Sequence, residues 1–84
     1  MVKEEIWGVS IRRAESFFRD QEDVAEEGCN DFRFGSCRIR LTELEPGNMG
    51  IWAADRTRVR MEGEAADVEN IYHRYFIQFL SAGG

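Results

Sequence analysis

The chain has 84 residues, of which 43% are apolar and 12% aromatic, so it can build one small core and no second domain. Its net charge of −5 argues against a generic nucleic-acid binder, because such proteins are usually basic. No apolar run approaches the ~20 residues of a membrane span, and no leader begins the chain, so we expect a cytoplasmic protein with one α+β domain over residues 1–84 and a flexible tail at 82–84.

The N-terminal third predicts a strand followed by a helix. Residues 2–9 alternate as a half-buried strand does, and we expect this strand to end near Val9. Trp7 also fits a helical stripe with Ile11, but Gly8 would weaken a helix that crosses it. A helix is expected from Ile11 to Glu27, with Ser10 as its N-cap and Gly28 as its stop. Its buried side would carry the apolar residues that recur at helical spacing: Ile11, Ala14, Phe17, Phe18, Val24 and Ala25.

The middle of the chain has the period of two that is typical of strands. One strand region covers 32–42, where Gly35 interrupts the alternation as a bulge or bend would, and a second covers 51–62. Between them, Glu45-Pro46-Gly47-Asn48 is the clearest turn signal in the chain. The apolar face of this hairpin would carry the following residues: Cys37, Ile39, Leu41, Thr57, Val59 and Met61.

The apolar positions change face along this hairpin, which a regular strand cannot do. Near the predicted turn the even-numbered residues are apolar, including Leu44 and Trp52, whereas farther away the odd-numbered residues are. We therefore expect either an irregularity between Ala53 and Thr57, or a Trp52 side chain that projects from the core as a binding or dimer contact.

The segment Asp67–Leu80 predicts the second helix, with Asp67 as its N-cap. Its apolar residues recur with helical spacing: Val68, Ile71, Tyr72, Tyr75, Phe76, Phe79 and Leu80. Because 71–80 is also rich in aromatic and β-branched residues, a strand is the alternative, although its alternation is poor. These elements predict a two-layer α+β domain, in which two helices cover one face of a hairpin-centred antiparallel sheet in the order βαββα or αββα.

An arginine-rich face of the sheet is the most specific chemical feature. The side opposite the core would carry Arg38, Arg40, Arg56, Arg58 and Arg60. Adjacent like charges destabilise a sheet, so these guanidiniums require counter-charges. The structural explanation is pairing with Glu43, Glu45, Glu62, Glu64 or the acidic side of the first helix, from this chain or a partner subunit. The functional explanation is an anion-binding face for phosphate, acidic peptide or RNA backbone, although Trp52 alone could stack a base there.

No motif for catalysis is present, so we predict a protein that is not an enzyme and has no cofactor. Cys29, Cys37 and His73 lack the spacing of a zinc site, and we expect no metal, with one buried and one exposed thiol. The predicted function is a small interaction module, a homodimer or one with another protein partner. Its contact surface would be the arginine side of the sheet or the Trp52 region, and neither nucleic acid nor membrane is an expected partner.

The chain ends Ser81-Ala82-Gly83-Gly84. In tail, length and acidity it resembles the sulfur carriers and ubiquitin-like modifiers, which end in a free Gly-Gly. This resemblance implies that Gly84 carries the carboxylate that is adenylated and then converted to a thiocarboxylate or amide. Those families have a ββαββ order with a strand leading into the tail, whereas we expect a helix here. A carrier or modifier role acting through Gly83 and Gly84 is therefore the alternative function.

Overall fold

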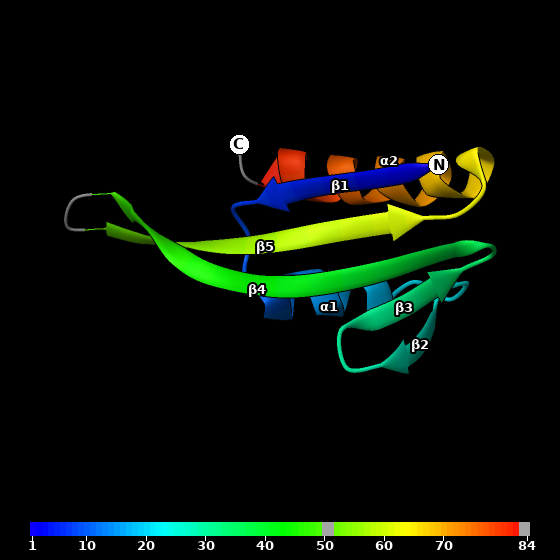
Figure 1. Ribbon diagram of the computed structural model, residues 1–84, viewed down its shortest axis with the longest axis horizontal. Helices are drawn as coiled ribbons and strands as arrows, with labels where there is room; N and C mark the ends of the chain where they lie inside the picture. Colours follow the sequence, from blue (N-terminus) through cyan, green and yellow to red (C-terminus); the bar gives the residue numbers. More distant parts are fainter. Residues whose placement is uncertain (50–51, 83–84) are drawn as a thin grey trace.

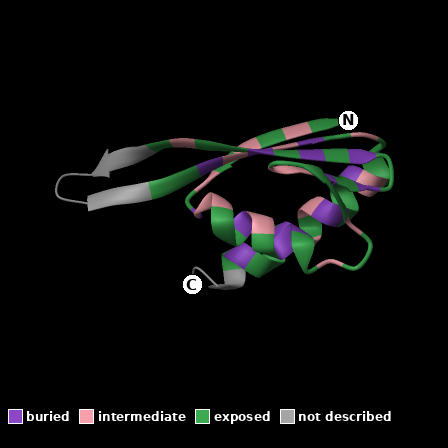
Figure 2. Cartoon of the chain, turned by 90° about the horizontal axis from the view of Figure 1, so that it is seen from below, coloured by how far each residue is buried: buried purple, intermediate pink, exposed green. Residues whose placement is uncertain are grey.

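A computed structural model describes the backbone of residues 1–49 and 52–82 and the side chains of residues 1–45 and 55–80. Its seven elements are β1 (Val2–Trp7), α1 (Ile11–Arg19), β2 (Ala25–Gly28), β3 (Asp31–Phe34), β4 (Cys37–Met49), β5 (Trp52–Glu62) and α2 (Ala65–Ala82). The strands form one antiparallel sheet in the order β1-β5-β4-β3-β2. Both helices lie on one face of it (Figures 1 and 2), which confirms the two-layer α+β prediction.

The core forms between this face and the two helices. Inward side chains of β4 and β5 are at most 3% exposed, as predicted: Ile39, Leu41, Val59 and Met61. The helices meet through aromatic rings, since Phe18 stacks on Tyr75 with centroids 5.5 Å apart and an interplanar angle of 8°. Phe18 also packs against Phe32 of β3 at 5.5 Å. Burial of these side chains stabilises the fold by roughly 1.5–3 kcal/mol each.

Helix α1 is shorter than predicted. It begins as expected, with the Ser10 hydroxyl accepting a hydrogen bond from the backbone amide three residues on, at 3.3 Å. It ends at Arg19 and not at Glu27, because residues 20–23 are all polar and give a longer helix no apolar side to bury. The backbone of 25–28 pairs instead with β3, so Ala25 is exposed and the predicted stop, Gly28, ends a strand.

The region predicted as one interrupted strand is a hairpin. Gly35 adopts φ +57° and, with Ser36, reverses the chain between β3 and β4. The prediction of Asp67 as an N-cap is also wrong, because α2 begins at Ala65. The Asp67 carboxylate instead accepts hydrogen bonds from the amide and hydroxyl of Ser36, at 2.9 and 2.7 Å. These bonds tie the β3–β4 turn to the start of α2 and lower the pKa of Asp67.

Strands β4 and β5 extend past the ends of β1 and α2 as an arm (Figure 1). The predicted turn at 45–48 is wrong, because β4 continues through it to Met49, which pairs with Trp52. The backbone of Trp52 therefore lies at the far end of the arm, and its side chain is outside the described residues.

The predicted irregularity in this hairpin is present at the base of the arm. The register changes between two pairs, Leu44 with Arg56 and Gly47 with Ala54. Glu45 and Pro46 together oppose Asp55, so the extra residue belongs to β4. A bulge accommodates Pro46 because proline has no amide hydrogen to donate to the ladder.

The helical interpretation of the C-terminal segment is confirmed, but its apolar side is only partly covered. Tyr75 and the other core-facing residues are buried, whereas Phe76 is 37% and Leu80 57% exposed. Helix α2 runs to Ala82, the first residue of the predicted tail, and residues 83–84 lie outside the described part of the chain. Neither described helix combines the length and apolarity that would be required to cross a membrane.

Candidate functional site

The sheet face opposite the helices presents a cluster of guanidinium groups. Alternation along β4 and β5 turns these side chains away from the core, and the register sets Arg40 directly opposite Arg60. Arg38, Arg40, Arg60 and Glu62 line a shallow depression of about 50 Å³. With Arg58, which lies two residues before Arg60 on β5, we call these four arginines the arginine face. The depression is lined by three guanidiniums and one carboxylate, so this surface is locally positive although the chain has a net charge of −5.

Arg38 is the best-paired member of the arginine face. Its Nε and Nη2 donate to the two carboxylate oxygens of Asp31 at 3.2 and 2.8 Å, in the forked geometry that suits this pair. These hydrogen bonds hold the pKa of Asp31 below its ordinary value, although desolvation opposes the shift. Arg38 is therefore already engaged by a neighbouring strand.

Arg58 and Arg60 have weaker partners. Glu4 of β1 lies 3.7 Å from Arg58 and 3.9 Å from Arg60, and Glu62 lies 3.4 Å from Arg60. All four side chains are more than 40% exposed, so water screens these pairs. Arg40 forms no ion pair with any described residue. An incoming anion would therefore meet one unpaired guanidinium and a second one with long, exposed contacts.

The counter-charges differ from those expected. Glu62 was predicted and contributes, but Glu4 and Asp31 were not. They reach the arginine face because β1 pairs with β5 and β3 pairs with β4, two adjacencies that no local pattern reveals. Glu43 and Glu45 lie instead beside a separate cavity of about 350 Å³ at the base of the arm.

The remaining predicted site residues are not part of the depression. Arg56 lines the cavity at the base of the arm, together with Glu43, Glu45 and Asp55. Trp52 lies farther along the arm, and its side chain is outside the described residues. Three of the five predicted arginines line the depression. Arg58 and then Arg56 continue the same alternation along β5, toward the base of the arm.

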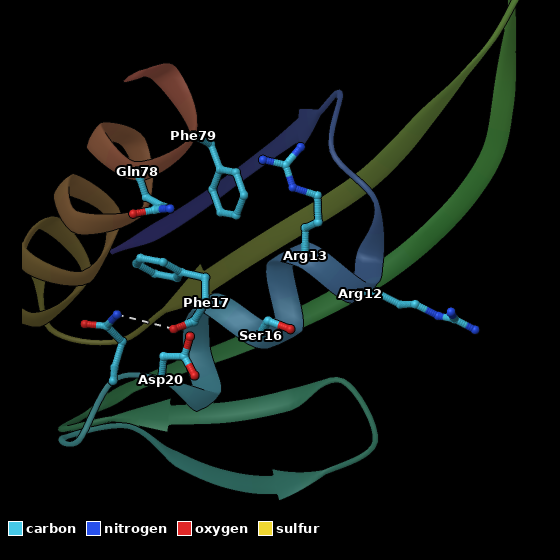
Figure 3. A pocket seen from close by; sticks show the side chains of 8 residues that line it. Arg12, Arg13, Ser16, Phe17, Asp20, Gln78 and Phe79 are labelled. Carbon is cyan, nitrogen blue, oxygen red and sulfur yellow. Dashed lines mark hydrogen bonds between the residues drawn. The ribbon is translucent and has the colours of Figure 1, made fainter. Parts of the chain in front are cut away.

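A cavity of about 440 Å³ opens between α1 and α2 (Figure 3). Phe17 and Phe79 form its apolar wall, and the Arg13 guanidinium lies 5.6 Å from the Phe79 ring centroid. Ser16 and Gln78 add polar groups at its edge, whereas Arg12 points away from it in Figure 3. None of the described residues that line this cavity is a cysteine or histidine. Sequence patterns missed it because it depends on how two separate helices pack.

The thiols and the histidine do not converge. Cys37 is buried and Cys29 exposed, as expected, and burial raises the pKa of the Cys37 thiol. His73 lies on the exposed side of α2. Within the described residues, no three His, Cys, Asp or Glu side chains are placed to hold a metal ion.

The resemblance to Gly-Gly carriers stays confined to the tail. A helix, α2, leads toward Gly83 and Gly84, where those families place a strand, and the order of elements is βαββββα, not ββαββ. Both glycines lie outside the described residues. No protein-family model matches the chain, and a search of curated proteins found no match either.

Proposed function

We propose that this protein is a non-enzymatic binding module whose arginine face holds an acidic segment of a protein partner. The observation that carries the proposal is Arg40, which forms no ion pair with a described residue and faces Arg60 across the β4–β5 ladder. Its neighbour on β3, Asp31, is hydrogen-bonded to Arg38 instead. A carboxylate or phosphate group placed over the depression would receive forked hydrogen bonds from both guanidiniums.

The strands supply the rigidity that such a site needs. The ladder fixes the backbones of Arg40 and Arg60 on both sides, since β4 pairs with β3 and β5, and β5 pairs with β1. Within this chain, binding therefore restricts only side chains, which reduces the entropic cost of forming the complex. The competing carboxylate, Glu62, is 57% exposed and 3.4 Å from Arg60, so an anion with better geometry would displace it.

A protein partner is favoured over nucleic acid by two observations. The net charge of −5 repels a polyanion as long as DNA or RNA. No aromatic side chain among the described residues lies on the arginine face, so the face offers no platform for stacking bases. A short acidic segment needs neither.

The test is a titration with a fluorescein-labelled hexaglutamate peptide, followed by anisotropy at low and high salt. The double variant Arg40→Gln/Arg60→Gln should bind at least about fivefold more weakly than the parent chain. The matched control Arg12→Gln removes an exposed arginine from α1, on the helix side of the sheet, and should change affinity less than about twofold. Binding of the parent chain should also weaken as salt rises.

Equal binding by the double variant and the parent would refute the proposal, provided that both unfold at the same urea concentration. Equal weakening by Arg12→Gln would also refute it, because it would indicate a general charge effect. The expected homodimer is tested in the same samples by sedimentation equilibrium. A dimer that uses the arginine face should dissociate in the double variant and at high salt.

A further inference from the structure

Strand β1 is an edge of the sheet with a free row of backbone groups. Met1 and Gly63 exchange two hydrogen bonds, at 2.7 and 3.0 Å, and this pair shows which residues of β1 are hydrogen-bonded to β5. Because bonded and non-bonded pairs alternate in an antiparallel ladder, the amides and carbonyls of Val2, Glu4 and Ile6 point away from β5. Among the strands that the structure describes, β1 pairs only with β5, so these groups are available to a further strand.

Helix α2 lies beneath this edge. Tyr72 donates a hydrogen bond to Glu5 at 2.6 Å, and Phe76 packs edge-on against Trp7 with centroids 5.9 Å apart. On a helix, Tyr72, Phe76 and Leu80 share one side at i, i+4 and i+8. We call these three residues the α2 shelf. It is half-buried at Tyr72 and becomes more exposed toward Leu80, at 57%.

The position of α2 determines whether a second copy of the chain or a single peptide strand can pair with β1. Two copies paired through β1 in an antiparallel manner would place both α2 helices on the same face of one continuous sheet. The two β1 strands would lie about 4.8 Å apart, whereas packed helices need 8–10 Å between their axes. Since α2 runs along β1 (Figure 1) and contacts it, the two helices would collide. A single extended peptide has no helix and avoids this collision.

Charge further defines the peptide. The side chains of Val2, Glu4 and Ile6 point to the sheet face away from the helices, and Val2 and Ile6 are about half exposed, at 51% and 50%. Glu4 has only long, exposed contacts with Arg58 and Arg60, at 3.7 and 3.9 Å, and a basic peptide residue opposite it would compete with them. A peptide residue opposite Glu4 is therefore best basic, and residues opposite Val2 and Ile6 are best apolar. Residues between them turn toward the α2 shelf and are best apolar as well.

We propose that β1 binds an extended apolar peptide with a central basic residue, as a sixth antiparallel strand whose inward side chains rest on the α2 shelf. This surface adjoins the arginine face through Glu4, but the proposal does not depend on anion binding at that face. Backbone hydrogen bonds would supply affinity, and the side chains that rest on the shelf would supply specificity and further apolar contact, as in other cases of strand addition.

The probe is a labelled seven-residue peptide, Ser-Val-Leu-Lys-Leu-Val-Ser, whose lysine is designed to face Glu4. It should bind the full chain with a dissociation constant below about 1 mM. N-methylation of the lysine amide removes a donor that points at β1 and should weaken binding at least about tenfold. N-methylation of either leucine amide, which points away, should change it less than about threefold.

A matched pair of protein variants tests the shelf. Phe76→Ser removes a shelf ring and should weaken binding at least about fivefold. Ile77→Ser removes an equally accessible apolar residue, 50% exposed, from another side of α2 and should leave affinity within about twofold. Unfolding in urea verifies that both variants remain folded.

Amide exchange locates the peptide, since the amides of Val2, Glu4 and Ile6 should exchange more slowly in the complex. The proposal is overturned by a peptide that does not bind at about 1 mM, by equal effects of the two methylations, or by equal effects of the two serine variants. Binding that leaves these three amides unprotected would overturn it too.

Discussion

The buried hydroxyl of Tyr75 provides the sharpest test of the core. The Tyr75 side chain is 0% exposed among Trp7, Phe17, Phe18 and Phe79, and its hydroxyl has no hydrogen-bond partner in the described residues. Burial raises the pKa of this hydroxyl. A buried polar group without a partner costs about 1–3 kcal/mol. Tyr75→Phe should therefore raise the free energy of unfolding by about 1 kcal/mol, whereas most core substitutions lower it.

Tyr72 supplies a matched comparison with the opposite sign. Its hydroxyl donates to the Glu5 carboxylate at 2.6 Å, and desolvation, followed by this hydrogen bond, raises the pKa of Tyr72 to about 12. Tyr72→Phe makes the same chemical change one turn earlier on α2 but removes a satisfied bond. The free energy of unfolding should fall by about 1 kcal/mol, at the low end for a bond to a charged group because the site is partly exposed.

Urea unfolding and thermal melts of the three proteins at pH 7 measure both effects. For a chain of this size, 1 kcal/mol corresponds to a shift in Tm of about 4–8 °C, so the two variants should melt on opposite sides of the parent. A Tyr75→Phe variant that loses 1 kcal/mol or more would refute the reasoning, because the hydroxyl would then have a stabilising partner.

Three further predictions concern two glycines, the hydrogen bonds between Asp67 and Ser36, and the backbone of β1. A Cβ at Gly63 would lie 2.5 Å from a backbone oxygen of the β3–β4 turn, so Gly63→Ala should lower the free energy of unfolding in urea by at least about 2 kcal/mol. At Gly28 the nearest contact of a Cβ is at 3.8 Å, so Gly28→Ala should change the free energy of unfolding by less than about 0.5 kcal/mol. The pKa of Asp67 is lowered in the folded state, so the Asp67 carboxylate stabilises the fold fully above the unfolded pKa of about 3.9. This stabilisation is lost as the pH falls through the lower folded pKa. Thermal melts between pH 2 and 7 should therefore depend less on acid in Asp67→Asn than in the parent chain. The Glu4 amide points away from β5, whereas the Glu5 amide points toward it. Glu5→Pro should therefore be far more destabilising than Glu4→Pro in melts followed by circular dichroism. Equal losses of stability would show that the hydrogen-bonded residues of β1 are assigned wrongly.

Periodicity predicted the elements whose side chains bury one face. The strand segments around Ile39 and Val59 alternate between buried and exposed, and α2 repeats every three to four residues, so both were found from the sequence. β2 carries no such signal, because all four residues of Ala25–Gly28 are exposed. Backbone pairing with β3 holds it, and an exposed acidic segment next to a helical pattern is typical of a helix face. This is why α1 was predicted too long.

The candidate site was also predictable only in part from the sequence. Alternation along each strand was enough to place Arg38, Arg40 and Arg60 on one face. Their counter-charges required the order of strands, because Glu4 comes from the other end of the chain and reaches Arg60 only through the β1–β5 ladder. The turn at 45–48 was mispredicted for a related reason, since a proline in a bulge and a proline in a turn have the same local sequence.

The pairing of β1 with β5 also determines when this chain can become native. Val2 is paired with Glu62, so on the ribosome β1 has no partner strand until residues 57–62 have emerged. Contacts between such distant residues form slowly, because the intervening chain must first be ordered. The hairpin of β4 and β5, by contrast, is local. We expect the N-terminal segment to be the last strand to dock, which leaves Trp7 and the aromatic rings of α2 open to chaperones during synthesis.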